Sequence, residues 1–328
     1  MISHFSNNPR SRNLLLTYLL ALCLLPFSAQ GYDAWQDEAR YTVTYHIDLS
    51  GLPEDATTVW IPLPAENPDQ TVVSMQVNSP WPLEEIRDNR YNRVGVIRLP
   101  AGKRDVASAT LVHRIVRKPG RGLAADNLSS ADKPADYLSA QRMIPLQGMI
   151  SDIATEVRAN NQENPDLRRV YYDYVYDLMT YSKEGEGWGQ GDAIWACQSK
   201  YGNCTDFHSL YIGLARSQGI AARFKIGFPL AADTDTGRHD GYHCWAEVWE
   251  DNHGWSPLDA SEAKKAGLKD EYYGVIPSDR IEFTTGRDIR LSREQRGEPL
   301  NYFVYPYAES ATAIIEKLPV KLTYIRDR

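Results

Sequence analysis

The 328 residues include 43 acidic and 36 basic side chains, which gives a formal net charge of −7 at pH 7. This acidic balance, without a basic stripe along the chain, argues against nucleic-acid binding. The length suits about two domains, and the chain contains no internal repeat or low-complexity segment.

The first 31 residues have the pattern of a secretory signal peptide. Arg10 and Arg12 precede an apolar run, residues 14–27, which is shorter than the about 20 residues that a membrane-spanning helix needs. Small residues at 29 and 31 favour cleavage after Gly31, and an uncleaved anchor is the alternative. We therefore expect residues 1–31 to be a signal peptide and the mature protein to be periplasmic or secreted. The membrane is expected to be involved only through this segment.

Residues 32–117 alternate apolar and polar side chains in short runs, which turn-rich stretches such as residues 51–55 separate. Five or more strands without a helical pattern predict a β-sandwich domain. Residues 118–147 are rich in Gly, Pro, Ser and Ala and are expected to be a linker. Residues 148–328 then form the second domain.

The second domain is expected to open with two helices, because apolar side chains recur at helical spacing in residues 150–157 and 167–181. The glycine-rich stretch 185–204 is expected to be a loop. Residues 264–275 are polar and are expected to be irregular. Two later segments have the pattern of strands, namely residues 280–291 and 319–328.

Cys204 lies at the predicted start of a further helix. Asn203 is a favourable N-cap residue, the apolar side chains of residues 207–214 share one helical face, and Gly219 ends the helix. Unpaired N–H groups and the helix dipole favour a thiolate at this position, and only the thiolate attacks a carbonyl. Cys204 is therefore a candidate nucleophile. A small buried residue in a helix cap is the alternative.

His243 opens residues 243–250, which alternate like a strand, with His243 on the face of the tryptophans. After a predicted hairpin turn, the returning strand carries Asp259, although Pro257 is expected to break its ladder. A nucleophilic thiol needs a base, and the base needs a group that fixes its tautomer. Cys204, His243 and Asp259 together therefore predict a Cys-His-Asp catalytic site. A structural histidine and a loop aspartate are the alternative.

The cysteines and histidines of this region could alternatively be ligands of a metal ion. The spacings of the candidate ligands match no closed zinc pattern, and the chain has no C-x2-C pair. His243 and Cys244 are also expected to point to opposite faces of a strand. We therefore predict no metal and no cofactor. His208, one helical turn after Cys204, is expected to serve helix packing. The candidate ligands are Cys197, Cys204, His208, His239, His243 and Cys244.

Three blocks of the sequence resemble the catalytic core of the transglutaminase-like superfamily of papain-like thiol enzymes. They are G-x-C-x-D followed by A-R-x-x-G-I-x-A-R in residues 202–223, H-x-W-x-E-x-W in residues 243–249, and W-x-x-x-D in residues 255–259. Cys244 departs from the small residue that is common after the histidine. The resemblance covers about residues 148–285 and is greatest to bacterial exported members described as cysteine proteases. It implies an α+β fold, in which the active helix packs against an antiparallel sheet.

The resemblance also implies roles for single residues. Cys204 corresponds to the nucleophile, His243 to the base and Asp259 to the orienting group. Related thiol enzymes use a tryptophan or glutamine upstream of the cysteine near the oxyanion, so Trp188 and Gln190 are candidates there. A plain loop contact is the alternative for each.

Removal of the signal peptide leaves three cysteines. If Cys204 is the nucleophile, Cys197 and Cys244 can pair as a disulfide in an exported protein, which would clamp two of the motif blocks. Two buried, reduced thiols are the alternative.

The expected reaction is acyl transfer from an amide of a protein or peptide substrate, through a thioester on Cys204. Hydrolysis of the thioester makes the protein a peptidase or amidase, whereas capture by an amine makes it a crosslinking transglutaminase. Hydrolysis is preferred by analogy with the exported relatives. A catalytically silent envelope-binding module, in which the sandwich carries the function, is the alternative from another class.

Overall fold

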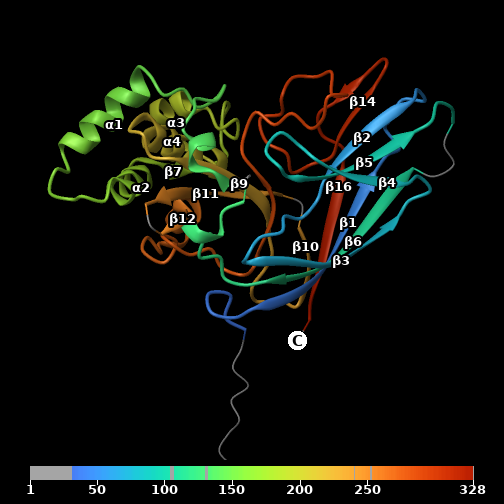
Figure 1. The fold of residues 1–328 in the computed structure, drawn as a ribbon, viewed down its shortest axis with the longest axis horizontal. Coiled ribbons are helices and arrows are strands. Elements are labelled where there is room, and N and C mark those ends of the chain that lie inside the picture. The colour runs from blue at the N-terminus through green and yellow to red at the C-terminus, as the bar shows by residue number, and fades with distance from the viewer. Residues whose placement is uncertain (1–31, 104–106, 130–131, 240, 252, 328) are drawn as a thin grey trace, which may run out of the picture. The chain divides into compact units, whose positions relative to one another are not determined.

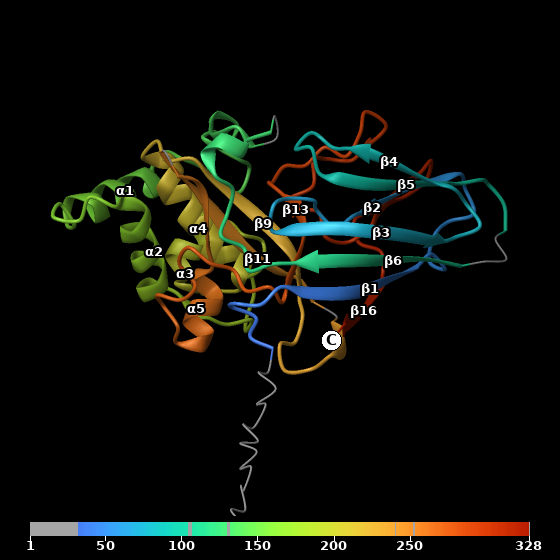
Figure 2. The ribbon, with the colours of Figure 1, turned by 60° about the horizontal axis from the view of Figure 1, so that its bottom comes forward.

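The computed structural model describes residues 32–327, apart from residues 104–106, 130–131, 240 and 252. The expected signal peptide lies outside the described residues. Tyr32–Arg328 forms one compact unit, in which helices gather at one end and two five-stranded sheets at the other (Figures 1 and 2). The α+β fold predicted from the sequence is confirmed. No α-helix of the described part combines the length and hydrophobicity that crossing a membrane requires.

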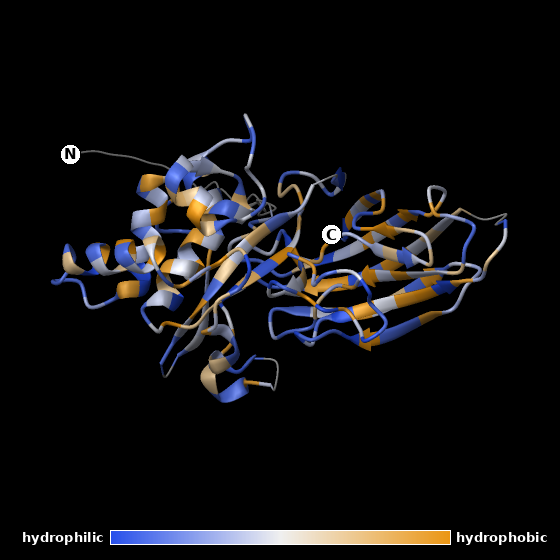
Figure 3. Cartoon of the chain, turned by 90° about the horizontal axis from the view of Figure 1, so that it is seen from above, coloured by the Kyte–Doolittle hydropathy of each residue, from blue (hydrophilic) through white to orange (hydrophobic). Residues whose placement is uncertain are grey.

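Two antiparallel sheets form the β-sandwich, with strand orders β10-β16-β1-β6-β3 and β15-β14-β2-β5-β4. Buried side chains alternate with exposed or half-buried ones along β1 because one face of its sheet is turned to the core. Figure 3 shows hydrophobic and hydrophilic residues following one another along the strands. The strands from the first 117 residues are β1 (Ala39–Asp48), β2 (Thr57–Pro62), β3 (Gln70–Asn78), β4 (Leu83–Arg87), β5 (Arg93–Leu99) and β6 (Ser108–Arg117).

The remaining strands of the sandwich come from much later in the chain. They are β10 (Thr236–His239), β14 (Tyr307–Ser310), β15 (Ile314–Ile315) and β16 (Val320–Asp327). β16 pairs with β1 along its whole length, and β14 pairs with β2. The expected domain 148–328 therefore requires a correction, because its last strands belong to the sandwich. Periodicity identifies residues 319–328 as a strand but carries no information about a partner nearly 300 residues away.

A four-stranded antiparallel sheet of order β12-β11-β9-β13 forms the second part of the unit. Helix α4 lies against β9 and β11 and is surrounded by the other α-helices, so every residue from Cys204 to Arg216 is buried. The elements are α1 (Met149–Ala159), α2 (Leu167–Leu178), β7 (Thr180–Tyr181), α3 (Ala193–Ser199), β8 (Tyr201–Gly202), α4 (Cys204–Ser217), β9 (Ala222–Pro229), β11 (His243–Glu250), β12 (Gly254–Leu258), α5 (Ala260–Ala266) and β13 (Arg280–Thr285).

The segment expected to be a linker is fixed against this sheet. Leu123 forms a β-bridge with Trp255, and the ring of Tyr137 packs edge-on against that of Trp255. Gly122 has a φ of +87°, and a Cβ there would lie 1.7 Å from the Trp255 carbonyl oxygen, so only glycine fits. Leu123 and Tyr137 of this segment therefore pack on the core. Its described residues also form the short 3-10 helices Ala125–Asn127 and Pro134–Tyr137.

Three local expectations differ from the structure around the motif blocks. Helix α3 occupies part of the expected loop 185–204, and α5 begins immediately after Asp259 and extends into the stretch expected to be irregular. Pro257 does not break the hairpin, because Glu247 pairs with Pro257 and the ladder continues to Leu258. β12 is an edge strand, where proline needs no partner for the N–H group that it lacks.

Candidate active site

A capping box organises the start of α4, where Cys204 is the first helical residue. The Asn203 side chain accepts a hydrogen bond from the Thr205 N–H (2.8 Å), and the Asp206 carboxylate accepts one from the Asn203 N–H (2.9 Å). Among the described residues, the backbone N–H of Cys204 has no hydrogen-bond acceptor. This leaves a free donor beside the thiol, where the helix dipole is positive.

Asp206 also ties the glycine-rich loop to the same helix start. Its carboxylate accepts hydrogen bonds from the N–H groups of Gly189 (2.7 Å) and Gly191 (2.9 Å). A Cβ at Gly202 would lie 2.4 Å from the Asp206 Oδ2 atom, so the tight approach requires glycine. The G-x-C-x-D motif is therefore a device that positions both the helix start and the loop beside it.

His243 and Asp259 meet through the hairpin of β11 and β12. The Nε2 atom of His243 is hydrogen-bonded to the Asp259 carboxylate, which directly follows Leu258, the last residue of β12. The imidazole also acts on Cys204, whose thiol pKa it lowers, and Nδ1 is the ring nitrogen that remains for the sulfur. Cys204, His243 and Asp259 thus form one continuous line. They are buried, with exposed fractions of 3%, 5% and 1%.

The charges along this line favour an ion pair. Burial opposes ionisation of Cys204, but hydrogen bonds from Cys244 and His243, together with the histidine charge, hold the pKa of the thiol well below its usual range. Burial likewise disfavours a charged His243, yet Asp259 and Cys204 raise the pKa of His243 to about 10. The pKa of Asp259 is lowered by His243 and His208 against the effect of burial. These shifts favour a thiolate beside an imidazolium in the resting site.

Two residues beyond the predicted three complete the cluster. His208 lies with Nε2 3.4 Å from Asp259 Oδ1 and with Nδ1 3.7 Å from the Cys244 sulfur. Burial and the neighbouring Cys204 raise the pKa of Cys244, so it remains a neutral thiol that can donate to the thiolate. Two features of the sequence could have pointed to these residues. His208 follows Cys204 at the i, i+4 spacing of one helical turn, and Cys244 stands after His243, where a small residue is common.

The proposed pairing of Cys197 with Cys244 is not formed. All three cysteines of the described part are free and buried. Cys244 faces α4, where its sulfur lies 3.9 Å from the Thr205 hydroxyl. Cys197 lies on α3, and burial raises the pKa of its thiol. Packing of β11 on α4 thus places Cys244 beside Cys204 instead.

The side chains of Trp188 and Gln190 make no described contact with Cys204. The Trp188 indole N–H donates to the Gly185 carbonyl within the loop (3.2 Å), and Gln190 is exposed. Their role near the oxyanion stays a prediction. Tyr242, which sequence reasoning missed, lies nearer to the thiol. Its hydroxyl is 2.9 Å from that of Thr205, and burial together with the charge of Cys204 raises its pKa.

His243, Asp259 and Glu262 bring donor atoms within 4.8 Å of one another, a spacing that could hold a cation. A metal ligand must be a neutral imidazole, whereas the pKa of His243 is about 10 because Asp259 and Cys204 outweigh its burial. Its Nε2 atom is also the atom bonded to Asp259. The arrangement suits proton transfer better than metal binding.

Alkylation of Cys204 should show the low pKa of its thiol. We expect its rate with iodoacetamide to stay nearly constant from pH 8 to pH 6 and to fall only in stronger acid. An ordinary thiol loses about tenfold in thiolate per pH unit below its pKa. Cys197, whose pKa is raised by burial, is the internal control and should slow over the same range. Mass spectrometry resolves the two sites, and parallel slowing of both would contradict the ion pair.

Replacement of Asp206 by alanine should destabilise the protein by roughly 3 kcal/mol, because three N–H groups lose their acceptor. Asp192, which caps α3 through the N–H groups of Ile194 and Trp195, offers a matched control. Asp192→Ala should cost about 1 kcal/mol, as an ordinary cap does. Urea denaturation measures both changes, and equal losses would show that Asp206 is only a helix cap.

Comparison with known proteins found the following similarities. Residues 151–260 match the model of the transglutaminase-like superfamily. An uncharacterised protein of Haemophilus influenzae is 24% identical over 316 residues, which cover 82% of this chain and 85% of that protein. The crystal structure of a "putative cysteine protease" from Cytophaga hutchinsonii has a TM-score of 0.52 at 13% identity, over 88% of this chain and 98% of that one. The periplasmic domain of TgpA from Pseudomonas aeruginosa has a TM-score of 0.36 at 15% identity, over 70% and 90%.

Proposed function

We propose, from the transglutaminase-like core in residues 151–260, that this protein is a thiol enzyme that cleaves amide bonds of proteins or peptides. One observation carries the proposal, namely that Cys204 at the start of a buried helix is coupled electrostatically to His243, which is hydrogen-bonded to Asp259. A thiolate, an acid–base group and a carboxylate that orients it are the parts that such chemistry needs.

The reaction follows from the positions of these groups. The Cys204 thiolate attacks the amide carbonyl carbon, and the free N–H of Cys204 receives the negative charge that develops on the oxygen. The His243 imidazolium gives its proton to the leaving amine, which leaves an acyl thioester on Cys204. Neutral His243 then takes a proton from water, which attacks the thioester and restores the thiolate. Asp259 stabilises the imidazolium in the steps where it is charged.

Hydrolysis is proposed in preference to transfer to an amine. The Cytophaga hutchinsonii structure that shares the fold bears the name of a cysteine protease. Water also needs no binding site of its own, whereas a second amine substrate has to reach a thiol that is only 3% exposed.

A search for new peptide ends tests this proposal. The purified protein is incubated with a cell-envelope extract, and mass spectrometry is used to look for new N-termini and for new isopeptide bonds. We expect new N-termini that are absent with Cys204→Ala. New isopeptide bonds without new N-termini would identify a crosslinking enzyme, and neither product would favour a binding module.

Export through the predicted signal peptide is part of the proposal. It is supported by Arg10 and Arg12 before the apolar run 14–27. N-terminal sequencing of protein recovered from a periplasmic or secreted fraction should start at Tyr32, whereas an intact N-terminus would indicate an uncleaved anchor.

A further inference from the structure

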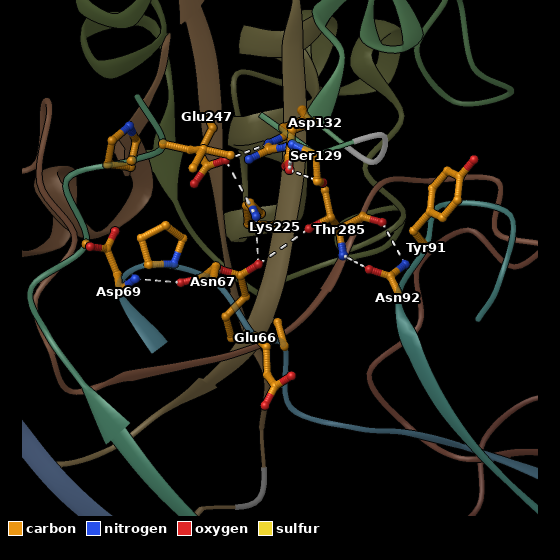
Figure 4. A pocket seen from close by; sticks show the side chains of 18 of the residues that line it. Glu66, Asn67, Asp69, Tyr91, Asn92, Ser129, Asp132, Lys225, Glu247 and Thr285 are labelled. Carbon is orange, nitrogen blue, oxygen red and sulfur yellow. Dashed lines mark hydrogen bonds and ion pairs between the residues drawn. The ribbon is translucent and has the colours of Figure 1, made fainter. Parts of the chain in front are cut away.

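A cavity of about 550 Å³ lies on the face of the four-stranded sheet that is turned away from α4. Its floor is formed by β9 and β11, and its walls by the loop after β2, the turn between β4 and β5, and the segment around residues 117–137. The volume is in the range of small-molecule sites. Figure 4 looks into this cavity, with Asp69 and Tyr91 on opposite sides of Lys225. Cys204, His243 and Asp259 do not line it.

The charged side chains of the floor are paired with one another. Arg223 bonds Glu247 (2.6 Å) and Asp132 (2.7 Å), and Lys225 bonds Glu282 (2.6 Å). These pairs satisfy the buried charges that β9 contributes, as buried ions require. The motif residues Arg223 and Glu247 therefore build the cavity floor.

Arg117 on the cavity wall differs from these paired residues. Its side chain is buried, with 2% exposed, and its Nε donates to the Arg280 carbonyl oxygen (2.8 Å). Within the described residues, its two terminal nitrogens take part in no hydrogen bond or ion pair. Burial lowers the pKa of Arg117 although the nearby carboxylates of Glu282 and Asp69 oppose this. The two terminal nitrogens are not among the buried atoms that lack a partner, so they face the cavity, where they can donate to a ligand.

Arg90 provides a second cation on the same cavity. Its Nε atom is buried and has no hydrogen-bond partner, and its Nη1 only reaches the Asp136 carbonyl oxygen at 3.5 Å. Apolar surface lies between the charged groups, because the rings of Trp245 and Tyr137 and the side chain of Leu123 also line the cavity. The cavity thus combines unsatisfied guanidinium donors with apolar walls, the usual composition of a ligand site.

We propose that this cavity binds a ligand through the carboxylate group of that ligand. The two terminal nitrogens of Arg117 donate a pair of hydrogen bonds to the carboxylate, and Arg90 provides a second positive charge. A planar carboxylate matches the guanidinium fork in geometry and charge. A small organic acid and the carboxyl end of a peptide share this chemistry. The site is independent of the proposed amide cleavage. One contact with the triad is made by Trp245, whose ring stacks on His243 at a centroid distance of 6.5 Å.

Calorimetric titration with matched probes tests the ligand chemistry. N-acetylated tetra-alanine with a free carboxyl terminus is compared with the same peptide as its C-terminal amide, with succinate, and with inorganic phosphate. The protein carries Cys204→Ala so that no peptide is cleaved. We expect the free-carboxyl peptide or succinate to bind. Binding of the peptide would identify the ligand as a peptide terminus, and binding of succinate would identify it as a small organic acid. The C-terminal amide cannot form the charge-assisted pair, so its affinity should be lower than that of the free-carboxyl peptide by about tenfold or more.

Variants of the cavity test the residues. Arg117→Gln and Arg90→Gln should each reduce carboxylate affinity, the former by about tenfold or more. Arg114→Gln makes the same charge change at an exposed position of β6 outside the cavity and should bind as the parent does. Circular dichroism checks folding. If Arg117→Gln does not fold, the decision rests on Arg90→Gln.

Several results would overturn the inference. They are equal affinity for carboxylate and amide, binding of phosphate alone, no binding of either carboxylate at millimolar concentration, or unchanged affinity in the folded cavity variants. Because every titration uses the inactive thiol variant, none of these results depends on whether the protein cleaves amides.

Discussion

The Cys204→Ala protein is expected to fold normally and to lose at least about 10⁴-fold in amide turnover, since the pKa of each of the other thiols among the described residues is raised. Cys244 cannot replace it, because burial and the adjacent thiolate raise the pKa of Cys244. Turnover is measured on the envelope peptides that the wild-type protein cleaves. Thermal unfolding then separates loss of chemistry from loss of structure.

Cys197→Ala is the matched control, because it removes another buried thiol of the same helical part of the chain. It should retain wild-type turnover. Substantial activity in Cys204→Ala, or an equal loss in both variants, would show that Cys204 is not the nucleophile.

His243→Ala should reduce turnover by a similar factor of about 10⁴ and should also make the remaining thiol less acidic. The imidazolium supplies a hydrogen bond and a charge that lower the pKa of Cys204, so alkylation at pH 6 should become slower than at pH 8. In the wild-type protein, turnover should fall as the pH rises through about 10, because deprotonated His243 can no longer protonate the leaving amine.

His253 provides the comparison for this variant. It lies in the turn of the same hairpin and its side chain is 74% exposed. His253→Ala should preserve both turnover and the alkylation profile. A His243→Ala protein whose Cys204 still reacts equally at pH 6 and pH 8 would mean that the helix start and Cys244, not the imidazole, ionise the thiol.

Local sequence was sufficient to place Cys204, because the N-cap and the apolar stripe that define α4 lie within a few residues of it. The hairpin that brings His243 to Asp259 is also a local element. The contact between His208 and Cys244 could not be predicted from local sequence. Their contact depends on how α4 packs against β11, which no periodicity describes.

The cavity around Arg117 was beyond sequence reasoning for a related reason. Arg117 ends a strand of the sandwich, while the ion pairs opposite it lie on β9 and β11, more than 100 residues later. The motif blocks include Arg223 and Glu247 but do not show what covers the face on which they lie. The segment 118–147 has the composition of a loop, and Gly122 admits the close backbone contact by which Leu123 pairs with Trp255.

The pairing of β16 with β1 has a consequence for how the protein reaches its native state. Strand β1 lacks its neighbour β16 until residues 320–327 have been synthesised. Strand β2 likewise lacks its neighbour β14 until residues 307–310 have been synthesised. Contacts of such long sequence separation slow folding, since a large loop must close before they form. A nascent chain is therefore expected to keep the edges of both sheets open until its final strands arrive, so a fragment that stops before residue 307 should aggregate.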